Sequence, residues 1–236
     1  MRDLIVSVRP ALAEIVECLI WRWTRSWPAT LLAIAMVGFC GAASAQDEPP
    51  PPTAIEGFRQ ARFGMNEEQV KQAIRKDFPA VAGKITTAMH PAEKTTVLSV
   101  TVADLLPHSG NARISYILGY RSKKLSQINI VWTSNSSTAE DETIVATANA
   151  LRDYFNSQNF KPDSVVANQQ LAQNAILVFR ASDEQKRTVL LVLSGVAAAA
   201  RGEDKKAAKP PPLTLELSYI EDPAHPDVFR IGKGQF

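Results

Sequence analysis

Residues 114–132, ISYILGYRSKKLSQINIVW, decide the class of fold. Apolar side chains occupy every second position on both sides of the polar turn Arg121-Ser122-Lys123-Lys124. They are Ile114, Tyr116, Leu118 and Tyr120 before the turn, and Ile128, Ile130 and Trp132 after it. A period of two predicts strands that are half buried, and the short polar turn predicts that they pair as an antiparallel hairpin.

Further segments show the same alternation. Upstream, residues 98–102 alternate apolar and small polar side chains and predict a strand before the hairpin. Downstream, residues 175–181, 188–196 and 213–219 predict three more strands after a polar loop. The chain is therefore expected to hold two groups of three antiparallel strands.

A short helix is expected before the first group of strands. Asn66 is a favourable N-cap, and Gln69 stands three residues later, as a capping box requires. Glu67 and Glu68 place negative charge in the first turn, where it suits the helix dipole. The apolar positions of this helix recur at helical spacing before Pro79 ends it: Val70, Ile74 and Phe78.

A second helix is expected between the two groups of strands. Ser137 and Glu140 have the spacing of another capping box. The helix that follows carries apolar residues along one face: Ile144, Ala148, Leu151 and Phe155. The element order, helix then three strands and again helix then three strands, predicts an α+β fold with helices layered on a sheet.

The expected organisation has four parts. Residues 1–45 are an N-terminal extension and signal peptide, and residues 46–56 are a proline-rich leader. A globular domain follows at 57–222, with halves at about 57–134 and 135–222, and residues 223–236 form an irregular tail. Whether the two halves share one sheet or form two stays open at this point.

The N-terminal part has the features of an export signal. Arg22 and Arg25 precede the apolar run 31–39, and the small residues of 43–45 end at a cleavage site between Ala45 and Gln46. Cleavage would place the domain in a periplasm or outside the cell. The alternative is an uncleaved inner-membrane anchor, in which case this segment would be the chain's contact with the membrane. Residues 1–21 fit the signal poorly, which favours a translation start nearer Trp21.

Several classes of function are not expected. Both cysteines, Cys18 and Cys40, lie in the part that would be removed, so the domain has no thiol for catalysis or zinc. The net charge is +2 and the charges are interspersed, so a nucleic-acid partner is not predicted. The three histidines, His90, His108 and His225, lack the spacing of metal ligands. Phosphate-loop and nucleophile-elbow motifs are also missing. No metal, no cofactor and no enzymatic activity are therefore expected.

The segment FGMNEEQV at 63–70 resembles the helix start of small outer-membrane assembly proteins of the BamE (SmpA/OmlA) type. Doubled, the order of helix and strands resembles the architecture of β-lactamase inhibitory protein. The chain as a whole resembles exported proteins of alphaproteobacteria. The resemblance implies a non-catalytic protein that acts by binding another protein of the cell envelope.

The candidate interaction residues lie in the hairpin. Arg121, Lys123 and Lys124 form a basic tip, and an exposed Trp132 beside them would be a binding hot spot. The other interpretation, which we favour, places Trp132 in the core, with lysines that only keep the turn soluble. An open sheet edge is a further candidate for binding a partner. We therefore predict binding of another envelope protein, with a small-ligand or lipid-binding module as the alternative and a hydrolase as the third reading.

Overall fold

The computed structural model describes residues 51–135, 137–196, 212–232 and 234. The expected signal peptide, its cleavage site at Ala45 and Gln46, and both cysteines lie outside the described residues. Among the residues that are described, no helix is long and apolar enough to cross a lipid bilayer.

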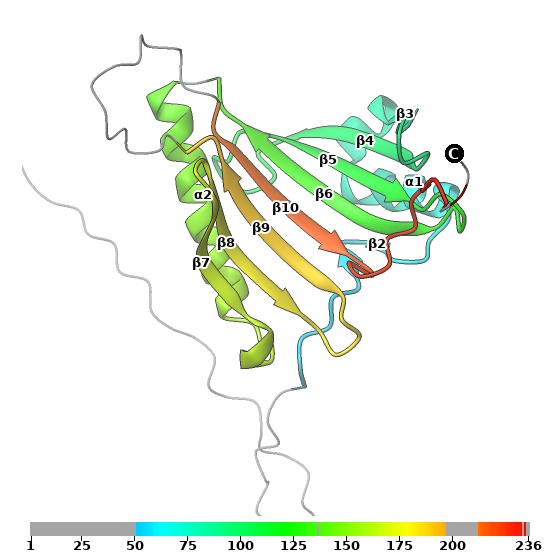
Figure 1. Ribbon diagram of the computed structural model, residues 1–236. Helices are drawn as coiled ribbons and strands as arrows, with labels where there is room; N and C mark the ends of the chain where they lie inside the picture. Colours follow the sequence, from blue (N-terminus) through cyan, green and yellow to red (C-terminus); the bar gives the residue numbers. More distant parts are fainter. Residues whose placement is uncertain (1–50, 136, 197–211, 233, 235–236) are drawn as a thin grey trace, which may run out of the picture. The chain divides into compact units, whose positions relative to one another are not determined.

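The largest element of the described chain is one antiparallel sheet of eight strands (Figure 1). Their order across the sheet is β3-β4-β5-β6-β10-β9-β8-β7. The strands are β3 (Thr86–Met89), β4 (Thr96–Ala103), β5 (Asn111–Leu118), β6 (Leu125–Thr133), β7 (Val166–Ala172), β8 (Ala175–Ser182), β9 (Thr188–Ser194) and β10 (Thr214–Ile220). The smaller elements are the hairpin β1 (Gly57–Phe58) and β2 (Ala61–Arg62), the helices α1 (Glu67–Asp77) and α2 (Thr138–Asn156), and the 3₁₀ turns η1 (Pro79–Lys84) and η2 (Pro162–Ser164).

The expected fold class, two successive units of one helix and three strands, is wrong. The described fold is mostly β, and each half contributes four strands to the single sheet. The strands that the sequence did not reveal are the two edges, β3 and β7. Every residue of both edge strands is solvent-exposed. Because an edge strand without a buried face needs no alternation of apolar and polar side chains, its sequence looks like a loop.

The two halves meet at the centre of the sheet. The last strand of the first half, β6, pairs antiparallel with the last strand of the chain, β10. Each half runs outward from this central pair to its own edge, β3 on one side and β7 on the other. The sheet is thus continuous across the boundary between the halves.

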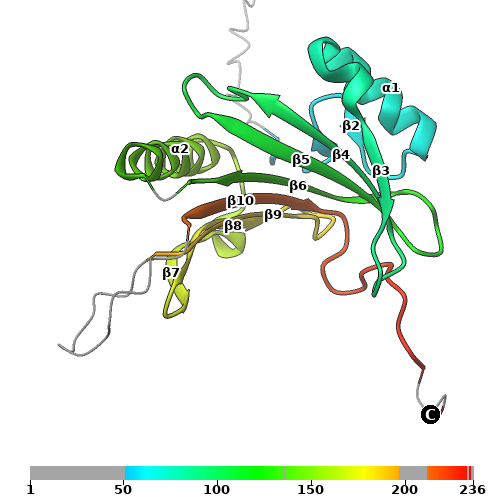
Figure 2. The ribbon, with the colours of Figure 1, turned by 90° about the horizontal axis from the view of Figure 1, so that it is seen from above.

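Strand register sorts the side chains between two faces of the sheet. Residues directly opposite each other in antiparallel strands project to the same face. One row on the apolar face crosses six strands through Leu98, Tyr116, Ile128, Tyr219, Val189 and Ala181. Both helices pack on this face, α1 through Val70 and Ile74 and α2 through Leu151 and Phe155. Figure 2 shows the two helices on the same side of the sheet.

The opposite face is more polar, although it also carries apolar side chains such as Leu190 and Val131. The row beside the one above crosses the strands through Ser99, Ser115, Asn129, Ser218, Leu190 and Arg180. Ser99 and Ser115 are hydrogen-bonded through their hydroxyls at 3.1 Å, and the Gln127 amide donates to Asn129 at 2.8 Å. Neither α1 nor α2 packs on this side (Figure 2), which we call the open face.

The capping box predicted at the start of each helix forms completely in α1 and only in part in α2. The capping box of α1 is confirmed, since the Asn66 side chain accepts from Gln69 N and the Gln69 side chain accepts from Asn66 N. At α2 the Ser137 hydroxyl accepts from Glu140 N at 3.4 Å, which confirms the N-cap. The Glu140 carboxylate, however, accepts from Asn135 N instead of returning to the cap, so the box is incomplete.

Candidate functional site

Trp132 lies in the core. Its side chain is 2 % exposed on the apolar face of β6, between Ala112 of β5 and Leu215 of β10. An exposed hot spot at this residue is therefore wrong, and the alternative that places it in the core describes the structure. Arg121, Lys123 and Lys124 are solvent-exposed in the turn before β6. Trp132 is near the other end of that strand, so the structure does not bring the four residues together (Figure 1).

The basic turn binds a segment of its own chain. The Asp227 carboxylate accepts hydrogen bonds from the backbone N–H of Arg121 at 2.9 Å and of Ser122 at 2.8 Å. The backbone O of Asp227 accepts from Tyr120 N at 2.8 Å, and the Tyr120 ring packs edge-on against Phe229 at 5.4 Å. The C-terminal residues 222–232 carry no helix or strand, yet this contact fixes them on the turn.

This contact changes the pKa of the Asp227 carboxyl. Partial burial acts to raise it, but the hydrogen bonds from Arg121 and Ser122 outweigh burial and hold the pKa below its ordinary value. Gly119 leaves the room that the carboxylate needs, because a Cβ at position 119 would overlap it. In the turn predicted to bind a partner, the backbone N–H groups of Arg121 and Ser122 are therefore already bonded to Asp227.

A cavity of about 520 Å³ lies on the helix-covered side of the sheet, between α2 and the sheet. The sheet contributes Ile130, Trp132, Val189, Leu217 and Tyr219, and α2 contributes Leu151, Tyr154 and Phe155. The Phe155 ring stacks on Phe179 at 5.4 Å, which holds one wall in place. Because cavities of this size with apolar and aromatic walls are typical of small-molecule sites, it is the main candidate site.

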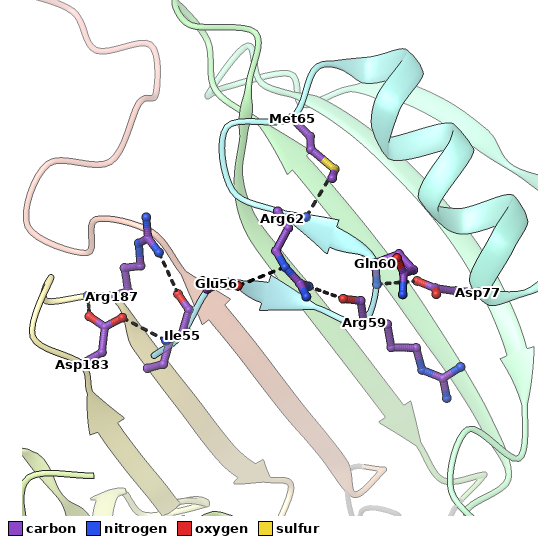
Figure 3. Close-up of polar contacts among 9 residues, drawn as sticks. All are labelled: Ile55, Glu56, Arg59, Gln60, Arg62, Met65, Asp77, Asp183 and Arg187. Atoms are coloured by element: carbon purple, nitrogen blue, oxygen red, sulfur yellow. Dashed lines mark hydrogen bonds and ion pairs between the residues drawn. The ribbon is translucent and has the colours of Figure 1, made fainter. Parts of the chain in front are cut away.

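Residues 51–58, which we call the N-terminal strap, contribute another wall of the cavity through 53–58. Ile55 is 4 % exposed; its N–H donates to the Asp183 carboxylate at 2.9 Å and its O accepts from the Arg187 guanidinium at 3.4 Å (Figure 3). Further along the strap, Thr53 N donates to Asn159 O at 2.9 Å. The strap therefore belongs to the folded domain, although its proline-rich sequence predicted a leader that ends at residue 56.

The β1–β2 hairpin anchors the inner end of the strap. Glu56 and Arg62 form an ion pair at 3.2 Å, and Gln60 N donates to the Asp77 carboxylate of α1 at 3.0 Å (Figure 3). Arg59, at the tip of the hairpin, has a left-handed φ of 52°. Its guanidinium lies over the Phe78 ring, 4.7 Å from the centroid. The hairpin thus connects the strap to the first half of the sheet.

One polar atom on the cavity wall is not satisfied. The indole Nε1 of Trp132 is buried and has no hydrogen-bond partner among the described residues. Tyr219, which also lines the cavity, has its hydroxyl pKa raised by burial, so this phenol stays neutral at physiological pH. The wall formed by the sheet is therefore uncharged and largely apolar, and the charged residues that line the cavity, Glu56 and Arg59, come from the segment that precedes α1.

The other residues considered from the sequence do not form a site together. His90 contacts Glu93, and His225 contacts Asp222, each within three residues along the chain. Within the described ranges no group of three His, Cys, Asp or Glu side chains is arranged to hold a metal ion. The acids of the first turn of α1 are paired with Lys71, at 2.8 Å and 3.2 Å.

Sequence reasoning missed the strap; it anticipated an apolar cleft between helices and sheet only under its alternative, a small-ligand or lipid-binding module, and named none of the lining residues. The one available signal was Ile55, the single large aliphatic side chain in the segment PPPPTAIE at 49–56, where a solvated tether needs none. In comparisons with known proteins, no family model, no curated protein and no solved structure matches this chain. The cavity and the open face are therefore the features from which a function is inferred.

Proposed function

We propose that this chain is a non-catalytic binding protein that holds an apolar small molecule in the cavity between α2 and the sheet. The observation that carries the proposal is the cavity itself, about 520 Å³ in volume and walled mainly by apolar and aromatic side chains. Clefts of this volume with apolar and aromatic walls are typical of sites that hold a small molecule.

The walls come from parts of the chain that are far apart in sequence. The strap, α2 and the central strands each contribute side chains. Such a site is preformed once the domain has folded, which lowers the entropic cost of binding. The export signal expected at 22–46 supports the further proposal that binding takes place in the periplasm.

The test uses paired substitutions on α2. Ala150 lines the cavity and is solvent-exposed, so Ala150→Phe would fill the entrance without disturbing the buried face of the helix. Ala146 lies one turn earlier, is also exposed, and does not line the cavity, so Ala146→Phe is the matched control.

Native mass spectrometry of the purified full chain should show a bound small molecule, or uptake of a long-chain ketone after extraction with organic solvent. We expect Ala150→Phe to weaken uptake at least about tenfold and Ala146→Phe to leave it unchanged. Equal uptake by both variants, or none by the wild type, would show that the cavity does not bind such molecules.

A second candidate is the binding of another envelope protein through the open face. The observation that favours it is the breadth of this face, which carries Ser115, Asn129 and Arg113 near the centre of an eight-stranded sheet. Asn129→Arg would place a long charged side chain in the middle of the face. A stoichiometric complex isolated from envelope extract should be lost in this variant and kept in Glu142→Arg, which changes the exposed side of α2.

A further inference from the structure

Two charged side chains are found among the described residues that line the cavity, and only one of them has a partner of opposite charge. Glu56 forms an ion pair with Arg62 at 3.2 Å. The Asp77 carboxylate, on α1 beside the hairpin, accepts from Gln60 N at 3.0 Å. Arg59 pairs with no carboxylate among the described residues, and its side chain points away from Glu56 (Figure 3). The cavity thus carries one positive charge that no acid of the described structure neutralises by contact.

Aromatic rings hold the Arg59 guanidinium at the cavity. Its central carbon lies 5.6 Å from the centroid of the Phe58 ring, which lines the cavity, and 4.7 Å from that of Phe78, the C-cap of α1. A guanidinium over aromatic rings keeps its N–H donors in its own plane, where the rings offer no acceptor. Arg59 is solvent-exposed, so an incoming molecule can reach these donors. Their planar arrangement matches the two oxygens of a carboxylate.

An aromatic wall leads from this cation into the cavity. The Phe58 ring packs against Tyr219 at 5.9 Å, and Tyr219 packs against Phe155 of α2 at 6.5 Å. All three residues line the cavity. Burial raises the pKa of the Tyr219 hydroxyl, so the wall carries no charge at physiological pH. The cavity therefore has a positive end at the hairpin and an uncharged, largely apolar surface that leads away from it.

We infer that the ligand is an amphipathic molecule with an apolar chain and a single negatively charged head group, such as the carboxylate of a fatty acid, which pairs with Arg59. The chain lies along the aromatic wall, and the head group stays at the hairpin, where water still reaches it. A carboxylate placed deeper in the cavity would lose its hydration without a cation beside it, which is costly. This inference rests on the proposed function of the cavity and adds the chemical class of the ligand.

Three probes of equal carbon number differ in the charge of the head group: dodecanoate, dodecanol and dodecylammonium. Their affinities for the full chain, for Arg59→Gln and for Arg113→Gln are measured by calorimetry, below the concentrations at which the probes form micelles. Because the head groups differ in hydration, the quantity compared is the change in affinity between wild type and variant for each probe. Arg113 is the matched control, since it is exposed on the open face and its substitution removes the same charge.

We expect Arg59→Gln to weaken the binding of dodecanoate about fivefold, which is the scale of an ion pair that stays partly solvated. Dodecanol should bind this variant and the wild type equally well. Dodecylammonium should bind the variant as well as the wild type or more tightly. Arg113→Gln should leave all three affinities unchanged.

The guanidinium itself gives a second readout. The spectrum of Arg59→Gln identifies the ¹⁵N–¹H signal of Arg59 Nε by its absence. In the wild type this signal should shift on addition of dodecanoate and much less on addition of dodecanol. If Arg59 only supported the shape of the hairpin, the two probes would have equal effects.

The outcomes distinguish the two proposals. If Arg59→Gln weakens all three probes equally, or weakens none, Arg59 does not bind the head group; the inference is then wrong while the cavity still binds. An equal loss of dodecanoate affinity in Arg113→Gln and Arg59→Gln would show an effect of net charge in place of contact, and would also overturn the inference. If no probe binds to the wild type, the proposed function fails together with the inference.

Discussion

Replacing Asp183 by alanine should release the N-terminal strap from the turn between β8 and β9. The carboxylate accepts from Ile55 N at 2.9 Å through one oxygen and from Gln185 N and Arg187 N, both at 2.9 Å, through the other. The amides of the turn can reach water when the carboxylate is removed, whereas the Ile55 residue is buried. Since a hydrogen bond to a charged group contributes about 1.5–3 kcal/mol, we expect a loss of about 2–3 kcal/mol, most of it from the Ile55 contact.

Amide hydrogen exchange measures this effect locally. A local loss of about 2 kcal/mol corresponds to exchange that is about 30-fold faster at residues 53–58. Asp183→Asn keeps one oxygen acceptor for the turn and should accelerate exchange in the strap more selectively. Glu184→Ala is the control, because its ion pair with Lys161 is exposed and should contribute less than about 1 kcal/mol. Unchanged exchange of the Ile55 amide in Asp183→Ala would refute the role given to this carboxylate.

Three further predictions concern the basic turn and the core. Gly119→Ala should displace the Asp227 carboxylate and cost about 1–3 kcal/mol in urea unfolding, whereas Gly83→Ala, whose Cβ would meet no atom within 4 Å, should be nearly neutral. The pKa of Asp227 is lower in the folded than in the unfolded state. Its contribution to stability is therefore present above the unfolded pKa of about 3.9 and is lost as the pH falls through the lower folded value. The amide signal of Arg121 should follow this titration in NMR spectra. Tyr116→Phe removes a buried hydroxyl that has no partner among the described residues. The free energy of unfolding, measured with urea, should therefore stay the same or rise by up to about 1 kcal/mol.

The sequence predicted those strands that have one buried and one open face. Alternation located β5, β6 and β10 because each places every second side chain in the core. The edge strands β3 and β7 bury no residue, so no alternation was imposed on them. In β7 the pairing register also shifts between Gln170 and Ala172. The missing edges are the reason that three strands were expected in each half in place of four.

The site was less predictable than the strands. The alternation of Trp132 with Ile128 and Ile130 favoured a ring on the buried face, and the structure places it there, but the pairing of β6 with β10 beside it is not recorded in any local pattern. The strap reaches the cavity through contacts between residues more than one hundred positions apart, such as Ile55 with Asp183. Composition alone favours an extended tether for a proline-rich segment, and only tertiary packing overrides that preference.

The pairing of β6 with β10 determines when the sheet can be completed during synthesis. The partners at its two ends, Thr133 with Thr214 and Gln127 with Ile220, are separated by most of the second half of the protein. Ribosomes release the N-terminal half first, so β6 has its backbone hydrogen-bonding groups unmatched along one side until the final strand has been synthesised. A chain truncated before residue 214 would keep the backbone edge of β6 unpaired. The growing chain should therefore be most prone to aggregate just before β10 is complete.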